Sequence, residues 1–311
     1  MRDLARALRI GIATAGIGMA ACRSTPPENA AAAAARTPAA PALVTLDFHS
    51  DVFGNERKLR ILLPAGYDDP ANRTRRYPVL YLNDGQNLFD SATATLNPME
   101  WRVDETVERL VARREIPPIV VVGVDNAGRR DRFREYFPWV DQYLQPPDPD
   151  PQGRRYPEFL LGEVVPFIEA RYRVERDPAG RGLGGSSAGA LAAMYTVVTR
   201  PGTFGRLLVE SPSIYVDDYR ILREAARVSV WPARIHLGVG SNESGAATCD
   251  PHAAAEAELV RDVRRFERVL RDAGVDSAGI SVVVAPCARH DEAAWAARLP
   301  AALTFLFGTA Q

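Results

Sequence analysis

The sequence predicts an α/β fold in which helices cover both faces of a mostly parallel central sheet. Two strand-like segments come first, and beyond them short apolar segments alternate with helical ones. That order is typical of a parallel sheet with crossover helices. In addition, residues 119–124 form a β-branched run without polar alternation, which indicates a central strand buried on both faces.

The strands are expected in chain order as follows. Residues 43–48 and 58–63 should pair as a hairpin, because Gly54 and Asn55 supply a turn between them. Residues 79–82 form a short apolar run that ends in the turn-forming sequence Asn-Asp-Gly. The remaining predicted strands cover residues 119–124, 182–185, 207–209, 235–239 and 281–284.

Helices are predicted in several intervals, where apolar side chains recur every three or four residues. These apolar faces consist of Val103, Val107, Leu110 and Val111, then Leu259, Val263, Phe266 and Leu270, and finally Trp295, Leu299, Leu303 and Leu306. Pro300 is expected to kink the last of these helices, because proline lacks the N–H that the helix needs.

Composition excludes several classes of protein. The chain has 311 residues, of which 46% are hydrophobic and 25% charged, with a formal net charge of −1. These values exclude a wholly disordered chain and a polytopic membrane protein. The chain also lacks the excess of positive charge that is typical of nucleic-acid-binding proteins. Its three cysteines are too few for a disulfide scaffold and too scattered for a zinc site.

Residues 1–21 have the pattern of a lipoprotein signal peptide. Three arginines precede an apolar run at residues 10–21 that is short for a membrane span. Small residues just before Cys22 resemble the bacterial lipobox. We therefore expect Cys22 to be lipidated, anchoring the chain to a membrane of the bacterial cell envelope, exposed to the periplasm or the exterior. The alternative is an ordinary signal peptide with a chance cysteine.

Residues 22–42 are rich in proline and alanine. Such a segment buries too little apolar surface to offset the loss of chain entropy on folding. We interpret it as a tether between the lipid and a folded domain at residues 43–311.

A candidate nucleophile stands in Gly185-Ser186-Ser187-Ala188-Gly189, which matches G-x-S-x-G. This motif makes a sharp strand-to-helix turn that lifts the central serine, Ser187, above the sheet, and its glycines allow close backbone approach. The following helix, residues 188–199, would present its N-terminus to a developing oxyanion. The alternative is a glycine-rich turn capped by serine.

A serine hydroxyl needs a base, and the chain has four histidines. His290 follows the last predicted strand, where this architecture places its base in the order Ser, acid, His. His252 is the alternative. His49 lies far upstream, and His236 lies inside a predicted strand.

The acid that orients the imidazole should follow strand 235–239. Glu243 stands directly after that strand, and Asp250 lies seven residues further on. We choose Glu243, with Asp250 as the alternative. A third alternative is that the site has no functional acid.

Two N–H groups are needed for an oxyanion hole. We expect the first from Ala188, next to the nucleophile, and the second from Gln86, because Gly85 lets the chain turn toward the site. The alternative is that Asp84 and Gly85 form only a tight turn.

Several segments resemble the esterase D-like group of α/β-hydrolases, which includes enterochelin esterases, S-formylglutathione hydrolases and feruloyl or acetylxylan esterases. The segments are residues 77–89 (YPVLYLNDGQNLF), 101–105 (WRVDE), 121–126 (VVGVDN), 134–138 (REYFP) and 184–189 (GGSSAG), with Phe204-Gly205 and Ser211-Pro212-Ser213 downstream and His290, Glu292 and Trp295 near the end. Many members have Met where Ala188 stands, but the backbone donor is the same.

The resemblance implies an α/β-hydrolase fold and a serine esterase with Ser187, Glu243 and His290, needing no metal and no organic cofactor. Asp84, Trp101 and Tyr136 are our candidate substrate-binding residues, although the rings of Trp101 and Tyr136 fit a core as easily. The substrate that the resemblance implies is a small-molecule ester.

Cys249 and Cys287 flank the acid and the base. An exported domain meets an oxidising compartment, and both loops should leave the same edge of the sheet. We predict a Cys249–Cys287 disulfide that joins the acid loop to the base loop; two unpaired thiols are the alternative.

The sequence thus predicts a carboxylic ester hydrolase that works through an acyl-enzyme. One alternative is an acyltransferase like the related mycolyltransferases, in which an alcohol replaces water. Another is a lipid-anchored binding protein on a hydrolase scaffold, without catalysis.

Overall fold

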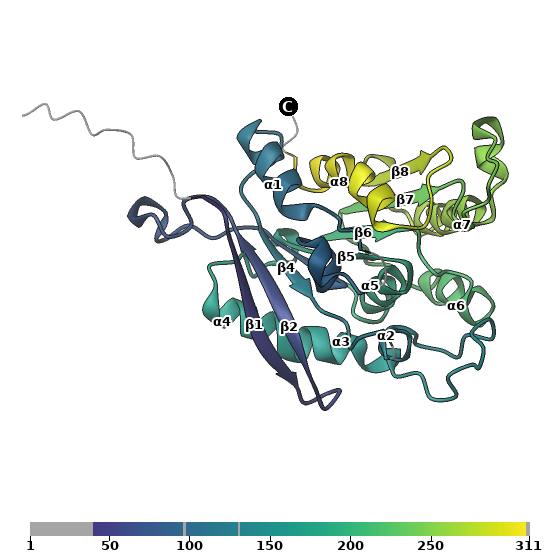
Figure 1. The fold of residues 1–311 in the computed structure, drawn as a ribbon, viewed down its shortest axis with the longest axis horizontal. Coiled ribbons are helices and arrows are strands. Elements are labelled where there is room, and N and C mark those ends of the chain that lie inside the picture. Colours follow the sequence, from purple (N-terminus) through teal and green to yellow (C-terminus); the bar gives the residue numbers. More distant parts are fainter. Residues whose placement is uncertain (1–39, 96–97, 130, 309–311) are drawn as a thin grey trace, which may run out of the picture. The chain divides into compact units, whose positions relative to one another are not determined.

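An eight-stranded sheet forms the centre of the described part of the protein (Figure 1). The structure, a computed structural model, describes residues 40–95, 98–129 and 131–308. The predicted signal peptide, Cys22 and the tether up to residue 39 lie outside the described residues. The strand order is β1-β2-β4-β3-β5-β6-β7-β8. Strands β1 and β2 pair antiparallel, β2 pairs antiparallel with β4, and the others pair in parallel.

Each strand that the sequence predicts is present, with ends that differ from the predicted ones by up to three residues. The strands are β1 (Ala42–Ser50), β2 (Asn55–Leu63), β3 (Val79–Asn83), β4 (Val120–Val124), β5 (Arg181–Ser186), β6 (Arg206–Glu210), β7 (Arg234–Gly240) and β8 (Ile280–Ala285). The mostly parallel α/β sheet is therefore confirmed.

The hairpin turn differs in detail from the prediction. Residues 51–54 make the turn, and Asn55 already pairs with Ser50 across the two strands. The Gly54 N–H donates to the Ser50 carbonyl at 2.7 Å, and Gly54 has a φ of 66°. Glycine suits that left-handed conformation because it has no Cβ.

Four predicted helices are present, and several more lie where no clean helical period was visible. The α-helices and the π-helical segment among the described residues are α1 (Val103–Ala112), α2 (Arg132–Tyr136), α3 (Tyr156–Glu158), the π-helical η5 (Phe159–Val164), α4 (Val165–Arg171), α5 (Ser187–Thr199), α6 (Val216–Ala225), α7 (Glu258–Asp272) and α8 (Glu292–Phe307). Pro157 and Pro166 lie at the starts of α3 and α4, and α8 continues through Pro300.

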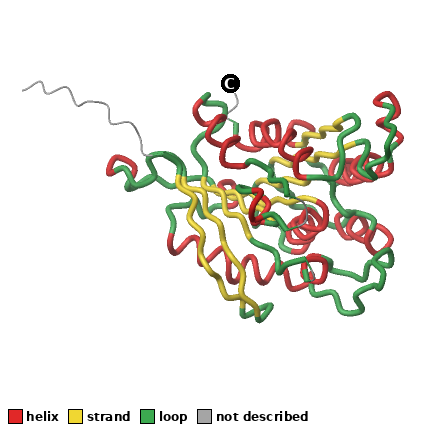
Figure 2. The backbone as a smooth tube through the Cα atoms, viewed as in Figure 1, coloured by secondary structure: helices red, strands yellow, loops and turns green. Residues whose placement is uncertain are grey.

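Helices lie on both sides of the sheet (Figure 2), and the buried apolar side chains form two cores, one on each face. Alternate residues of one strand point to opposite faces, so Tyr81 of β3 joins one core and Leu82 joins the other. Helices α3 to α7 contribute to the first core, and α1 and α8 contribute to the second. This confirms helices on both faces.

The parallel strands set where the site lies. In such a sheet the loops after the carboxyl ends of the strands form the binding edge. Here the predicted site residues of the folded domain lie in the segments that follow β3, β4, β5, β7 and β8. Across residues 40–95, 98–129 and 131–308, we find no helix with the length and apolar character that a membrane span requires.

Candidate active site

Ser187 stands at the sharp turn between β5 and α5. Its φ of 55° is left-handed, which is rare for a residue with a Cβ and is typical of a nucleophile elbow. A Cβ on Gly185 would lie 2.8 Å from the Gly189 carbonyl carbon, and one on Gly189 would lie 2.9 Å from Asp84 Oδ2. Both flanking positions of the motif therefore need glycine.

His290 and Glu243 meet at the same edge of the sheet. His290 Nδ1 lies 2.6 Å from Glu243 Oε2, although the residues are 47 positions apart. Glu243 Oε1 accepts hydrogen bonds from the Gly240 N–H at 2.5 Å and from the Ser211 hydroxyl at 2.7 Å. The glutamate side chain is 7% exposed and the histidine 33%. The carboxylate is thus held in one orientation, with its second oxygen against the ring.

The alternative acid and base have other partners. Asp250 caps the short 3-10 helix η7 (Pro251–Glu256), where its Oδ1 accepts the His252 N–H at 2.9 Å. His236 is fully buried in β7, and its Nδ1 lies 3.2 Å from Ser281 Oγ. His49 lies 2.6 Å from Glu56 on the exposed hairpin. Among the described residues of the loops after β7 and β8, His290 is therefore the histidine whose ring contacts a carboxylate.

Backbone contacts link the nucleophile turn to the acid strand. The Ser213 N–H donates to the Ser187 carbonyl at 3.2 Å, and the Ser211 N–H donates to the Gly238 carbonyl of β7 at 2.8 Å. The segment after β6 thus spans from the nucleophile turn to β7.

The two expected oxyanion donors lie at the starts of helical segments. Ala188 is the second residue of α5, and Gln86 is the second residue of the 3-10 helix η2 (Gly85–Asn87). N–H groups at such positions have no partner within their own helix. Asp84 precedes η2 with a φ of 61°, and a Cβ on Gly85 would lie 2.6 Å from the Gly123 carbonyl carbon. The turn therefore depends on a glycine packed against β4.

Asp84 is the centre of a buried polar cluster beneath η2. Arg132 forms a bidentate ion pair with its carboxylate, with both distances 2.7 Å, and the Asn126 amide donates to Oδ1 at 2.6 Å. Burial opposes the charge of Arg132, but the pair with Asp84 outweighs it and raises the pKa of the guanidinium. The Tyr136 hydroxyl accepts the Asp84 N–H at 3.2 Å.

The three candidate substrate-binding residues are all buried: Asp84, Trp101 and Tyr136 are 3%, 2% and 1% exposed. Trp101 packs against Trp295 with ring centroids 5.7 Å apart, and the backbone N–H of Trp101 donates to the Asn87 carbonyl at 2.9 Å. Burial also raises the pKa of Tyr136 well above its usual value. In this structure these side chains support the loop that holds Gln86 and do not line an open cleft.

A disulfide joins Cys249 to Cys287, with Cα atoms 5.7 Å apart. The same two loops are linked by hydrogen bonds, from the Cys287 N–H to the Ser241 hydroxyl at 2.8 Å and from the Asn242 N–H to the Ala288 carbonyl at 3.0 Å. The acid loop and the base loop are therefore connected covalently and by their backbones.

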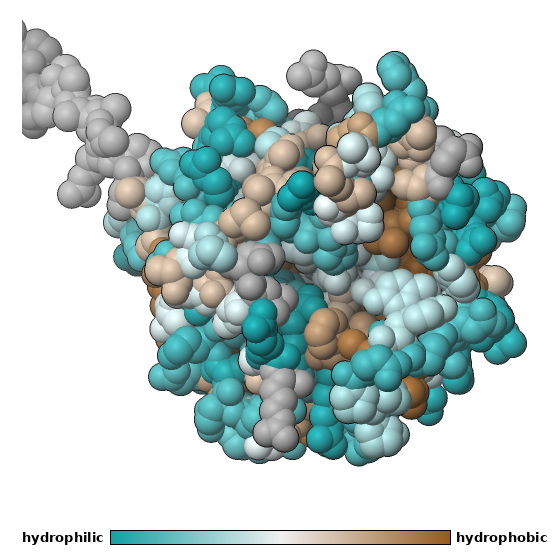
Figure 3. Space-filling model, turned by 45° about the vertical axis from the view of Figure 1, so that its right-hand side comes forward, coloured by the Kyte–Doolittle hydropathy of each residue, from teal (hydrophilic) through white to brown (hydrophobic). Residues whose placement is uncertain are grey.

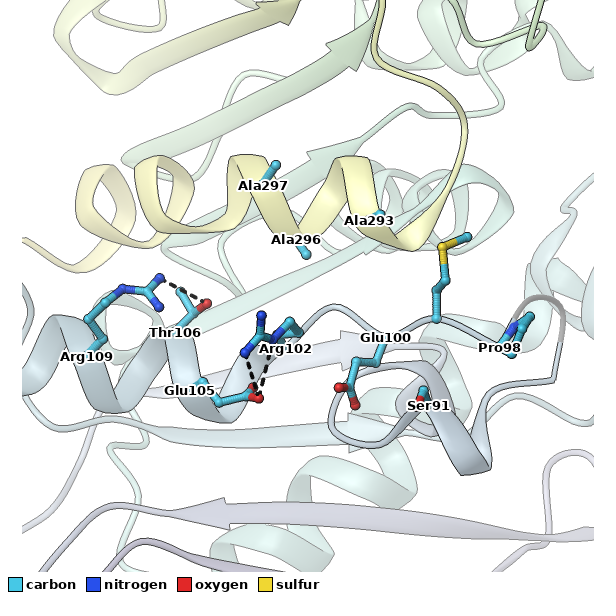
Figure 4. A pocket seen from close by; sticks show the side chains of 11 residues that line it. Ser91, Pro98, Glu100, Arg102, Glu105, Thr106, Arg109, Ala293, Ala296 and Ala297 are labelled. Atoms are coloured by element: carbon cyan, nitrogen blue, oxygen red, sulfur yellow. Dashed lines mark hydrogen bonds and ion pairs between the residues drawn. The ribbon is translucent and has the colours of Figure 1, made fainter.

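A cavity of about 530 Å³ lies between the α1 region and α8. Figure 4 shows Ala293, Ala296 and Ala297 on the α8 wall, facing charged and polar side chains of α1 and the preceding loop. Opposite them, Arg102 donates to Glu105 at 3.3 Å. The face in Figure 3 is mostly hydrophilic, with apolar side chains grouped in recesses. No group of three or more potential metal ligands occurs among the residues that the structure describes.

Sequence reasoning gave no role in the site to two residues that contact the acid and the base. Ser211 bonds to Glu243, and the Trp295 ring meets the His290 ring edge-on with centroids 5.2 Å apart. The resemblance contained both positions, but nothing in their local sequence indicated these contacts.

Comparison with known proteins supports the same conclusion as the fold. The model of a family described as "Putative esterase" matches residues 50–306. Two solved structures show the same fold. A ferulic acid esterase has a TM-score of 0.61 at 20% identity, covering 86% of this chain and 98% of that one. An IroE-like serine hydrolase from Shewanella oneidensis has a TM-score of 0.65 at 20% identity, covering 86% and 80%.

Related sequences include proteins with and without a described activity. Uncharacterized protein YbbA of Bacillus subtilis is 22% identical over 254 residues, covering 81% of this chain and 93% of the relative. The siderophore enterobactin esterase of Emericella nidulans is 33% identical over 157 residues, covering 48% and 50%. The ferri-bacillibactin esterase BesA of Bacillus subtilis is 27% identical over 161 residues, covering 48% and 52%. The chain thus spans about half the length of these two siderophore esterases.

The family match extends over most of the folded residues, from the end of β1 to the end of α8. By that match, the chain belongs to the putative esterase family of α/β-hydrolases and is a carboxylic ester hydrolase.

Proposed function

We propose that this esterase works through an acyl-enzyme on Ser187, with His290 as the general base and Glu243 as the acid that orients it. The observation that supports this most is the 2.6 Å contact between His290 Nδ1 and Glu243 Oε2. It occurs at the sheet edge to which the left-handed turn of Ser187 also belongs. A nucleophile turn and an oriented imidazole at one edge are what acyl transfer requires.

The proposed reaction has two halves. Ser187 Oγ attacks the ester carbonyl carbon while its proton passes to His290 Nε2, and Glu243 stabilises the resulting imidazolium through Nδ1–H. The Ala188 and Gln86 N–H groups hold the oxyanion, and losing one such donor costs about 3–4 kcal/mol of barrier.

The tetrahedral intermediate collapses, and the leaving alcohol takes the proton from His290. Water then attacks the acyl-enzyme and gives its proton to His290. The second collapse releases the carboxylic acid, and Ser187 Oγ regains its proton.

The test is to replace Ser187 and its neighbour separately. Ser187→Ala should abolish hydrolysis of an aryl ester and labelling by a fluorophosphonate. Ser186→Ala is the matched control, because Ser186 is buried beside the nucleophile and its side chain caps no helix N–H; it should keep both properties. Full hydrolysis by Ser187→Ala would contradict the proposal.

Siderophore esters are the first substrates that we propose to test. The names of two relatives support this, although the chain spans about half of each. Ferric siderophores, feruloyl sugars and thioesters should be compared on the wild type and on Ser187→Ala. Adding competing alcohols distinguishes hydrolysis from acyl transfer, since a transferase would form a new ester.

We also propose that Cys22 carries a lipid that anchors the protein in the cell envelope. Its support is the short apolar run ending in small residues before Cys22. In a bacterial host, labelled fatty acid should enter the wild type and leave Cys22→Ala unlabelled and outside the membrane fraction. Equal labelling of both chains would contradict the anchor.

A further inference from the structure

Ser211 follows β6 directly and is fully buried. Its hydroxyl oxygen lies within hydrogen-bond distance of three side chains: Glu243 Oε1 at 2.7 Å, Trp295 Nε1 at 3.0 Å and Arg298 Nη2 at 3.3 Å. One small side chain therefore connects the proposed acid to helix α8.

The chemistry of these three partners decides how the Ser211 hydroxyl points. A serine hydroxyl has one proton to donate and two lone pairs that accept. Indole and guanidinium nitrogens only donate, so Trp295 and Arg298 occupy both lone pairs. The single proton is then left for Glu243 Oε1, which has no proton when ionised. The hydroxyl is held in the orientation that donates to the carboxylate.

Arg298 is itself held in place by charge. Its Nε and Nη2 lie 2.8 Å and 2.7 Å from Glu210 Oε2, and both side chains are buried. Buried ion pairs of this kind are costly to break, because a lone charge would remain inside the protein. The donor to Ser211 is therefore a rigid one.

Trp295 contacts the acid and the base together. Its Nε1–H bonds to Ser211, and its ring packs edge-on against His290 with an interplanar angle of 83°. Helix α8 thus supports the Glu243 carboxylate through Ser211 and the His290 ring by packing.

The backbone of Ser211 adds a second observation. Its φ is 43°, a left-handed value that disfavours a residue with a Cβ. Glycine would adopt it without strain, yet the chain has serine there. The side chain that glycine lacks is the one that bonds to Glu243.

We propose that Ser211 is a positioning residue for the acid of the esterase: its hydroxyl fixes the Glu243 carboxylate so that the other oxygen faces His290. This rests on the proposed Ser187–His290–Glu243 function. Trp295 and Arg298 of α8 take part in this positioning, because they orient the Ser211 hydroxyl.

Two variants of Ser211 test it in the full-length protein. Ser211→Ala removes the hydroxyl, and Ser211→Gly removes it while relieving the left-handed strain. Both should lower kcat about 10- to 100-fold, the range for a hydrogen bond to a charged group, and KM should stay within about twofold because substrate contacts are unchanged. Thr196→Ala is the control: it removes a buried hydroxyl that bonds only to the Ala192 carbonyl in α5, and kcat should not change.

A spectroscopic measurement separates this proposal from the proposed function. The proton between His290 Nδ1 and Glu243 should give a strongly downfield proton resonance that disappears in His290→Ala. In Ser211→Gly it should shift or broaden, and in Thr196→Ala it should stay in place. An unchanged resonance together with wild-type kcat in both Ser211 variants would overturn the positioning role. Activity surviving in Ser187→Ala would instead overturn the proposed function, and the resonance would still decide the role of Ser211.

Discussion

The choice of acid is made at the scale of single atoms. Glu243 and Asp250 follow the same strand, and either could reach a histidine on the next loop. In the structure the Glu243 carboxylate has its two oxygens in different environments, one against His290 and one against Ser211 and the Gly240 N–H. The Asp250 carboxylate caps a 3-10 helix. This difference in partners predicts a difference in kinetics.

Glu243→Gln should lower kcat about 10²- to 10⁴-fold, because an amide stabilises the imidazolium far less than a carboxylate. Asp250→Asn is the matched control on the same loop and should keep kcat within about twofold, since its carboxylate does not touch the base. Steady-state hydrolysis of an aryl ester measures both. The reverse order of effects would assign the acid to Asp250.

Gly185→Ala tests the nucleophile turn at the same scale. Its new Cβ would lie 2.8 Å from the Gly189 carbonyl carbon, so the backbone must shift, at a cost of about 1–3 kcal/mol in unfolding free energy. The activity of Ser187 should fall with it. Gly162→Ala is the control, since nothing lies within 4 Å of its Cβ. Urea unfolding and aryl-ester hydrolysis report both effects, and a fully active Gly185→Ala would contradict this account.

At the scale of elements, two effects oppose each other at the start of helix α1: the helix dipole favours acidic side chains there, and burial disfavours their charge. Acidic residues in a first turn suit the helix dipole, and Asp104 and Glu105 occupy that turn. Burial and the neighbouring Glu105 nevertheless raise the pKa of Asp104 to about 6. Because the folded state then binds this proton more tightly than the unfolded chain, the contribution of Asp104 to stability falls as the pH rises from roughly 4 to 6.

Asp104→Asn should therefore be more stable than the wild type at pH 7 and should lose less stability between pH 4 and 6. Urea unfolding at a series of pH values measures this. The control is Glu108→Gln, an exposed carboxylate on the same helix. If Asp104→Asn and the wild type have the same pH dependence, the side chain is not destabilised by its surroundings.

At the scale of the whole molecule, the sheet and the disulfide bring distant segments to one edge. The strands that precede Ser187, Ser211, Glu243 and His290 are β5, β6, β7 and β8, which are neighbours in the sheet order. The Cys249–Cys287 disulfide closes 38 residues around α7. Such a closure restricts the unfolded chain and should stabilise the fold by about 4 kcal/mol in the chain-entropy model.

The double variant Cys249→Ser/Cys287→Ser should therefore unfold at lower urea concentration, with a loss of up to about 4 kcal/mol. Reductant should lower the stability of the wild type and leave that of the double variant unchanged. Thiol counting on the unreduced protein gives the matching chemical measurement. Two free thiols at Cys249 and Cys287 in oxidised protein would contradict the bridge.

The sequence predicted the strands and the nucleophile turn, but it did not predict several helices or the burial of residues near the site. The strands were predictable because apolar runs and turn residues act within a few positions, and the G-x-S-x-G turn is equally local. Helices α3 and α4 escaped prediction because Pro157 and Pro166 interrupt their apolar period. Burial of Asp84, Trp101 and Tyr136 was not visible either, since it depends on segments such as Arg132 and Trp295 that lie far along the chain.

By itself, the sequence determined the fold class, the eight strands and the candidate residues Ser187, Glu243 and His290, since each follows from local pattern or from the order of motifs. The tertiary structure alone decided that β4 lies between β2 and β3, that Glu243 rather than Asp250 faces His290, and that Ser211 bonds to that carboxylate. The physical reason is that these contacts join residues far apart in the sequence. Ser211 and Trp295, for example, are 84 residues apart, and only packing of the whole sheet against α8 brings them into contact.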